Sequence, residues 1–194
     1  MYWRVHFGSC APATRNLPSL ATLLQRFLVE IETLEPQIVV EEVADGGHIA
    51  NSIFRLRYRA DAPEFPHHVI AFWNEGAQRI PLCYIHFTAQ GEALLGGGAC
   101  VDNRALRRLP AELRNAIRRA GGLYKYSLAW SVQHFAPHFA AIFGYCGDAL
   151  AERTDLAVGF KKTEHPRLLV YFTRALDAST RDELIAQANA VGPF

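Results

Sequence analysis

The chain has 194 residues, half of them hydrophobic and 20% charged, which indicates one globular domain over 1–194 and excludes a disordered tail. The net charge of +1 argues against a nucleic-acid partner, because such proteins carry a strong basic excess. No apolar run approaches the roughly 20 residues of a membrane span, and residues 1–16 lack the apolar block of a signal peptide. We therefore expect a cytoplasmic protein without a membrane partner.

The cysteines are widely spaced and form no C-x-x-C pair, which makes a zinc site improbable. In a reducing cytoplasm such residues are usually buried free thiols, so we expect neither disulfides nor a metal cofactor. The four positions are Cys10, Cys83, Cys100 and Cys146.

The first elements expected along the chain are a helical extension and a strand–helix pair. Residues 17–34 carry apolar side chains at helical spacing, so an amphipathic helix is expected within an N-terminal extension over 1–36. Residues 37–43 read as a short strand. The turn Asp45-Gly46-Gly47 then leads into a helix over 48–59.

Three strands follow over 68–73, 80–88 and 93–101, and their short separators predict an antiparallel meander. The third strand contains Gly96-Gly97-Gly98 in its middle. Glycines inside a strand indicate either a bulge where a ligand approaches the backbone or tight packing of a neighbouring side chain.

A basic segment over 103–120 is expected to form a short inserted helix, with Pro110 in a first turn. One interpretation is a basic lip that receives phosphate groups or an acidic carrier protein; the other is a solvated surface helix. The arginines concerned are Arg104, Arg107, Arg108, Arg114, Arg118 and Arg119.

The stretch 118–160 organises the second half of the chain. A double-glycine turn precedes a helix over 123–135, an apolar strand over 140–145 and a helix over 148–158 that stops at Gly159-Phe160. A helix start with free amides and nearby cations is a natural seat for a phosphate. A hairpin over 161–172 and a helix over 178–194 complete the chain, and Ser179, Thr180 and Glu183 are placed as a capping box for that helix.

From about residue 37 to 172, this order of elements resembles the acyl-CoA N-acyltransferase superfamily, the GNAT-like fold. The resemblance implies an α/β (α+β) fold with a mixed, mostly antiparallel central sheet of about seven strands, flanked by helices and splayed at its centre. It further implies transfer of an acyl group from acetyl-CoA or a longer acyl-CoA to an amine, either a small molecule or a protein amino group.

The resemblance also assigns residues to the coenzyme. The phosphate motif of the family keeps its Arg and first Gly here, while Leu123 occupies its last slot. The implied cofactor-binding residues are Gly97, Gly98 and Ala99 on the splayed strand, and Arg118, Arg119, Gly121, Gly122, Leu123 and Lys125 at the phosphate turn.

Four residues are candidates for the chemistry, each with a structural alternative. Asp102 is a candidate base or a helix cap, and His86 is a candidate general base or a hydrogen-bonded structural histidine. Tyr145 and Cys146 are candidate proton donors to a thiolate or members of the core. Many family members carry a donor Tyr where this chain has Asp155.

Two other functional classes stay open on the sequence. One is a catalytically silent GNAT-like module that binds an acyl or nucleotide ligand, which Asp155 and Leu123 favour. The other is a partner-binding protein whose N-terminal aromatic residues and long helix form a homodimer.

Overall fold

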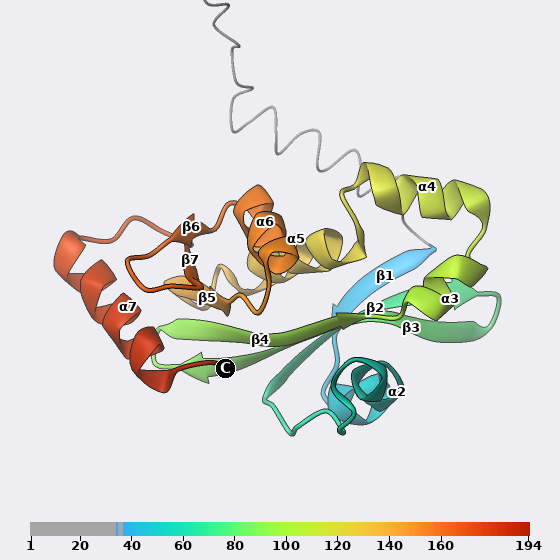
Figure 1. Cartoon of the computed structure of the whole chain (residues 1–194), viewed down its shortest axis with the longest axis horizontal. Helices are drawn as coiled ribbons and strands as arrows, with labels where there is room; N and C mark the ends of the chain where they lie inside the picture. The colour runs from blue at the N-terminus through green and yellow to red at the C-terminus, as the bar shows by residue number, and fades with distance from the viewer. Residues whose placement is uncertain (1–33, 35–36) are drawn as a thin grey trace, which may run out of the picture.

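Figure 1 shows the computed structural model, which describes Leu34 and residues 37–194. The helix expected over 17–34 and Cys10 lie outside the described residues, except that Leu34 packs in the core with 1% of its surface exposed. The other three cysteines are buried free thiols, as expected.

The described elements follow the predicted order closely. They are β1 (Ile38–Glu42), α2 (Gly46–Tyr58), β2 (His67–Glu75), β3 (Gln78–Gln90), β4 (Ala93–Val101), α3 (Asn103–Arg108), α4 (Ala111–Arg119), α5 (Leu123–Phe135), β5 (Ala141–Tyr145), α6 (Ala149–Val158), β6 (Lys161–Lys162), β7 (Leu168–Phe172) and α7 (Ala178–Val191).

The strands form one sheet of seven in the order β1-β2-β3-β4-β5-β7-β6. All neighbouring pairs are antiparallel except β4 with β5, which is parallel. Helices α5 and α6 lie over one face of the sheet, and α2 packs on the opposite face (Figure 1). The predicted mixed, mostly antiparallel sheet flanked by helices is therefore confirmed.

The parallel pair β4–β5 is short and then opens. Its register runs from Ala93–Ala141 to Gly96–Gly144, whereas β4 continues along β3 as far as Val101. At the end of β5 the backbone turns away, because the Cys146 N–H donates to the Arg167 carbonyl at 2.9 Å. The two strands thus diverge at the centre of the sheet, as the resemblance implied.

A bulge in β4 lies at the point of divergence. The β3–β4 register shifts between Ile85 and Phe87, and the Gly98 N–H donates to Nε2 of His86 at 2.9 Å. The His86 ring therefore occupies space that a side chain on β4 would need. A Cβ added to Gly97 would lie 2.1 Å from Nε2 of His86. Tight packing of a neighbouring side chain is thus one reason for the glycine run.

The basic insertion forms two helices rather than the single helix expected over 103–120. Asp102 caps α3, which ends at Arg108, and Leu109 is extended with φ −59° and ψ 152°. The residue before a proline avoids the helical region, so the chain breaks there and α4 begins after Pro110. Pro110 therefore separates two helices.

The caps of the two later helices are both aspartates. The Asp148 carboxylate accepts the Leu150 and Ala151 N–H groups at 2.9 Å each at the start of α6. For α7 the capping residue is Asp177, which accepts the Thr180 N–H at 2.9 Å. Ser179 and Glu183 contact each other at 3.4 Å instead of forming the expected capping box.

Replacing Gly97 by alanine is expected to destabilise the fold by about 1 to 3 kcal/mol, because its Cβ would overlap the buried His86 ring. Chemical denaturation followed by circular dichroism measures the change. Gly147→Ala is the matched control, since nothing lies within 4 Å of a Cβ there. A Gly97→Ala variant as stable as Gly147→Ala would contradict the packing explanation.

Candidate functional site

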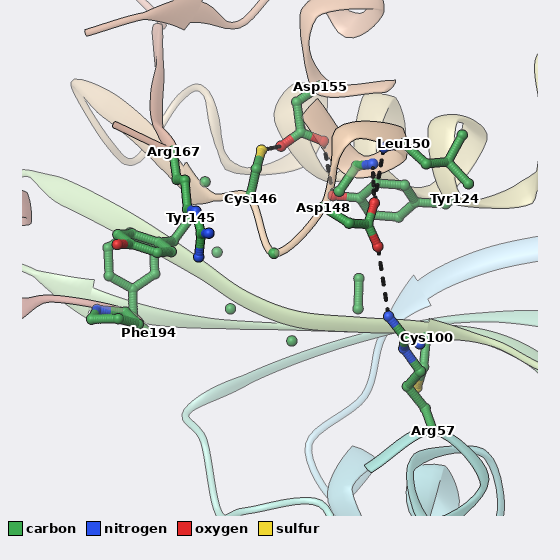
Figure 2. A pocket seen from close by; sticks show the side chains of 18 of the residues that line it. Arg57, Cys100, Tyr124, Tyr145, Cys146, Asp148, Leu150, Asp155, Arg167 and Phe194 are labelled. Atoms are coloured by element: carbon green, nitrogen blue, oxygen red, sulfur yellow. Dashed lines mark hydrogen bonds and ion pairs between the residues drawn. The ribbon is translucent and has the colours of Figure 1, made fainter. Parts of the chain in front are cut away.

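A cleft of about 670 Å³ opens where β4 and β5 diverge. Its floor includes Gly96, Gly97 and Gly98 of β4, and Gly144 and Tyr145 of β5 border it on the other side. Because β5 stops pairing with β4 at Gly96, a ligand can reach the backbone in this gap. The sheet is thus splayed at its centre, as the resemblance implied, and Figure 2 shows the cleft there from close by.

The starts of α5 and α6 border one end of this cleft. Tyr124 from the first turn of α5 lines it, together with Leu150 and Ala151 from the first turn of α6. A helix start carries a partial positive charge and amide donors without carbonyl partners in the helix. The α6 amides are already capped by the Asp148 carboxylate, whereas the start of α5 has no side-chain cap. The start of α5 therefore makes this end suited to an anionic ligand.

The double glycine ends α4 before α5 begins. The Gly121 N–H donates to the Arg118 carbonyl at 3.0 Å, and the Gly122 N–H donates to the Ile117 carbonyl at 2.9 Å. Gly121 has φ 88°, so this is a Schellman-type C-cap that requires glycine. These two amides are therefore engaged with α4. The open amides at this turn belong to the first turn of α5, from Leu123 to Lys125.

The other residues assigned to the phosphate turn differ in exposure. Leu123 is buried in the main core, so its side chain packs inward. Arg118 and Arg119 are exposed at the end of α4. Lys125 lies over the turn, since its Cδ would be 2.7 Å from a Cβ on Gly121. None of these residues is among those that line the cleft.

A buried carboxyl group lies beside the apex of the cleft. Asp155 on α6 is 3% exposed, and its Oδ2 would be 3.0 Å from a Cβ on Gly144. Oδ1 accepts the Tyr124 hydroxyl at 2.9 Å, and Oδ2 accepts the Cys146 thiol at 3.2 Å (Figure 2). Thus α5, α6 and the end of β5 meet in one polar cluster.

The pKa values in this cluster follow from burial and from its single carboxyl group. Burial raises the pKa of Asp155, although the hydrogen bonds from Cys146 and Tyr124 oppose this. Burial and the neighbouring Asp155 carboxylate raise the pKa of Tyr124 well above its usual value. The pKa of the Cys146 thiol rises for the same two reasons. Tyr124 and Cys146 are therefore protonated at neutral pH.

An ion pair crosses the cleft from one helical layer to the other. Arg57 on α2 lies 3.6 Å from Oδ2 of Asp148, and Figure 2 shows the two side chains meeting beside Cys100 of β4. Both side chains are more than half exposed, so this pair contributes little to stability. It does place one positive and one negative charge at the rim of the cleft.

Two of the predicted catalytic residues make contacts that hold the fold together. The Asp102 carboxylate accepts the Arg104 and Ala105 N–H groups at 2.8 and 3.1 Å, so it caps α3. His86 stacks on Phe65 with ring centroids 3.7 Å apart, and burial lowers its pKa to about 4. It is therefore neutral at pH 7. This geometry favours the structural alternative that the sequence left open for each residue.

The other two predicted catalytic residues, Tyr145 and Cys146, do line the cleft. Tyr145 is partly buried, and its ring meets that of Phe194 edge-on with centroids 6.0 Å apart. Cys146 is buried on the opposite side of the strand, beside Asp155. Successive side chains of a strand point to opposite faces, which explains why the two neighbours have different surroundings.

Sequence analysis did not assign Tyr124, Arg167 or Phe194 to a site, and it named Asp155 only as the residue in place of a donor Tyr. The partnership of Tyr124 with Asp155 joins two helices 31 positions apart, and no sequence spacing indicates it. Arg167 and Phe194 come from the β6–β7 turn and from the segment after α7. The only signal for Arg167 was its position directly after Pro166, at a turn.

No group of three or more His, Cys, Asp and Glu side chains within the described residues is arranged to hold a metal ion. Among the helices of residues 37–194, none is long and apolar enough to cross a bilayer.

No protein-family model matches the sequence, and the comparison with curated proteins found no match. Among solved structures, the chain is similar to a domain from Methanocaldococcus jannaschii at 10% identity and a TM-score of 0.47, over 70% of this chain and 98% of that one. It is also similar to a putative N-acetyltransferase from Lactobacillus plantarum at 13% identity and a TM-score of 0.44, over 71% of this chain and 99% of that one. A third similar structure is a GNAT family acetyltransferase from Brucella melitensis in complex with acetyl-CoA. Its identity is 13% and its TM-score 0.40, over 71% of this chain and 89% of that one.

These identities and TM-scores are too low to identify the fold, so the fold is assigned from the arrangement of the strands. The sheet has seven strands, with one parallel pair at its centre and antiparallel neighbours on both sides. A strand–helix–three-strand half precedes a helix–strand–helix–hairpin half, and the two halves meet at the divergence of β4 and β5. The chain therefore has the GNAT-like fold.

Proposed function

We propose that this protein transfers an acyl group from an acyl-CoA thioester, with acetyl-CoA as the simplest donor, to an amine. The observation that carries the proposal is the cleft at the β4–β5 divergence, with the uncapped start of α5 beside one end and a buried proton-carrying cluster at its apex. A thioester donor needs an anion site, access to strand backbone and a proton for its leaving group. The start of α5 offers the first, and the cleft offers the other two.

The anion seat is proposed at the first turn of α5. The amides from Leu123 to Lys125 and the Lys125 ammonium would hold the phosphates of the donor, and Arg118 and Arg119 would add positive charge at the rim. The glycines of β4 would let the rest of the donor run close to the strand.

The reaction forms a C–N bond and breaks a C–S bond. The amine enters neutral, having lost its ammonium proton to solvent, and attacks the thioester carbonyl carbon. The attacking nitrogen then releases its second proton to water, while the departing thiolate takes up a proton from the protein. One proton donor is therefore required at the apex of the cleft.

We assign this donor role to the Tyr124–Asp155 pair. The two groups share a hydrogen bond of 2.9 Å beside Gly144, where the strands part. Burial raises the pKa of Asp155, and the pKa of Tyr124 is higher still, so the pair holds a proton at neutral pH. Because the two groups are strongly coupled, the proton belongs to the pair rather than to either residue.

A second candidate is a silent module that binds an acyl-CoA or a related nucleotide without turnover. It is favoured by the Gly98 N–H, which donates to His86 and is therefore not directed at a ligand. Loss of one backbone donor to the developing oxyanion typically costs about a hundredfold or more in rate. The two candidates share the ligand and differ in whether thiol is released.

Replacing Lys125 by alanine is expected to weaken acetyl-CoA binding by about tenfold, because a charge-assisted contact to phosphate is lost. Isothermal titration calorimetry at low ionic strength measures the affinity. Lys161→Ala, an exposed lysine on β6, is the matched control and should bind as the wild type does. Equal affinities for the two variants would exclude the α5 start as the phosphate seat.

Tyr124→Phe and Asp155→Asn are each expected to lower the rate of thiol release by about a hundredfold. The first change removes the proton, and the second removes the carboxylate that accepts the Tyr124 hydroxyl and positions it. The double variant should be little slower than either single variant, since the two residues act as one unit. Thiol release from acetyl-CoA with a panel of amines measures the rates, and calorimetry checks that donor binding is retained.

Cys146→Ala provides the control for this assignment. It removes the second hydrogen bond to Asp155 but leaves the Tyr124–Asp155 pair intact, so a small effect on the rate is expected. A large loss in Cys146→Ala alone would move the donor role to the thiol. Binding of acetyl-CoA without thiol release by the wild type, with any amine, would favour the silent module.

A further inference from the structure

The two ends of the cleft differ in chemistry. The helix starts of α5 and α6 border one end. Tyr145 of β5, Phe194 after α7 and Arg167 of the β6–β7 turn form the other, which we name the Arg167 end. Figure 2 shows the Arg167 side chain extending from its turn alongside Tyr145 toward β4, with Phe194 below.

Arg167 is held at this end by its own backbone. It has φ 71°, a left-handed conformation that an arginine adopts at a steric cost. Its carbonyl accepts the Cys146 N–H at 2.9 Å, which ties the turn to the end of β5. The guanidinium is therefore attached to a fixed point directly beside the cleft.

Among the charged side chains that line the cleft, the Arg167 guanidinium is the one without a partner. The charged side chains concerned are Arg57, Asp148, Asp155 and Arg167. Arg57 pairs with Asp148, while Asp155 is buried and accepts two hydrogen bonds. Within residues 37–194, Arg167 has no ion-pair or hydrogen-bond partner for its side chain. Its planar donor fork suits a carboxylate.

We propose that the Arg167 end binds the carboxylate of the acceptor, so that the amine acylated by this protein also carries a carboxylate, as an amino acid does. This inference rests on the proposed function. A purely cationic acceptor such as a polyamine would place a second positive charge beside an unpaired guanidinium, which is unfavourable. The edge-on rings of Tyr145 and Phe194 provide an apolar wall for the side chain of such an acceptor.

The test compares two acceptors that share one ring. Phenylalanine and phenethylamine differ by the carboxylate alone, and their acetylation is followed by thiol release from acetyl-CoA. The wild type is expected to prefer phenylalanine in kcat/KM by roughly tenfold to a hundredfold, the range of a charge-assisted pair. Arg167→Gln keeps a polar side chain but removes the charge, and it should remove that preference without changing acetyl-CoA affinity. Arg108→Gln on α3, outside the cleft, should keep it.

A binding measurement separates this inference from the proposed function. Calorimetry with N-acetylphenylalanine, which has the carboxylate and the ring but needs no turnover, should show binding to the wild type and a loss of tenfold or more in Arg167→Gln. If N-acetylphenylalanine binds in this way but acetyl-CoA does not bind, the acyltransferase function is refuted and the carboxylate subsite is supported. If acetyl-CoA binds, but N-acetylphenylalanine binds equally to the wild type and to Arg167→Gln or does not bind at all, the subsite is refuted. Equal turnover of the two amines would overturn it as well.

Discussion

The parallel contact between β4 and β5 lasts from Ala93–Ala141 to Gly96–Gly144, and the rest of the site depends on where it stops. Two features lie where the strands part. On β4, the His86 ring enters the ladder and produces a bulge that only glycine accommodates. On β5, the Cys146 N–H bonds to the β6–β7 turn instead of continuing along β4. A gap in a sheet leaves strand backbone without a partner, and such backbone is a natural place for a ligand.

The divergence also determines which side chains meet. Once β5 turns away, the chain enters α6 through Asp148, and that helix carries Asp155 back over the gap. Helix α5 brings Tyr124 to the same point from the other direction. A buried carboxyl group is costly unless it is hydrogen-bonded, and here it has two donors. A satisfied polar cluster in an otherwise apolar core is thus a by-product of the same geometry that opens the cleft.

The two halves of the cleft follow from different parts of the chain. Helix starts border one end, and the electrostatic character there comes from backbone dipoles, which change little with sequence. The opposite end consists of side chains from a turn and from the segment after α7, such as Arg167 and Phe194. Loops and chain ends vary more readily than a sheet does, so under the proposed function this is where the choice of acceptor can be set without disturbing the donor site.

The sequence by itself determined the order and type of the elements, because apolar periodicity, prolines and glycines are local signals; α5 and β4 have the bounds that these signals indicate. It also singled out the glycine run of β4, which lines the cleft. The tertiary structure alone decided that Tyr124 meets Asp155 and that Arg167 borders the cleft with no side-chain partner among residues 37–194. Both depend on the placement of segments that are distant along the chain, and a sequence pattern records spacing along one element rather than distance between two.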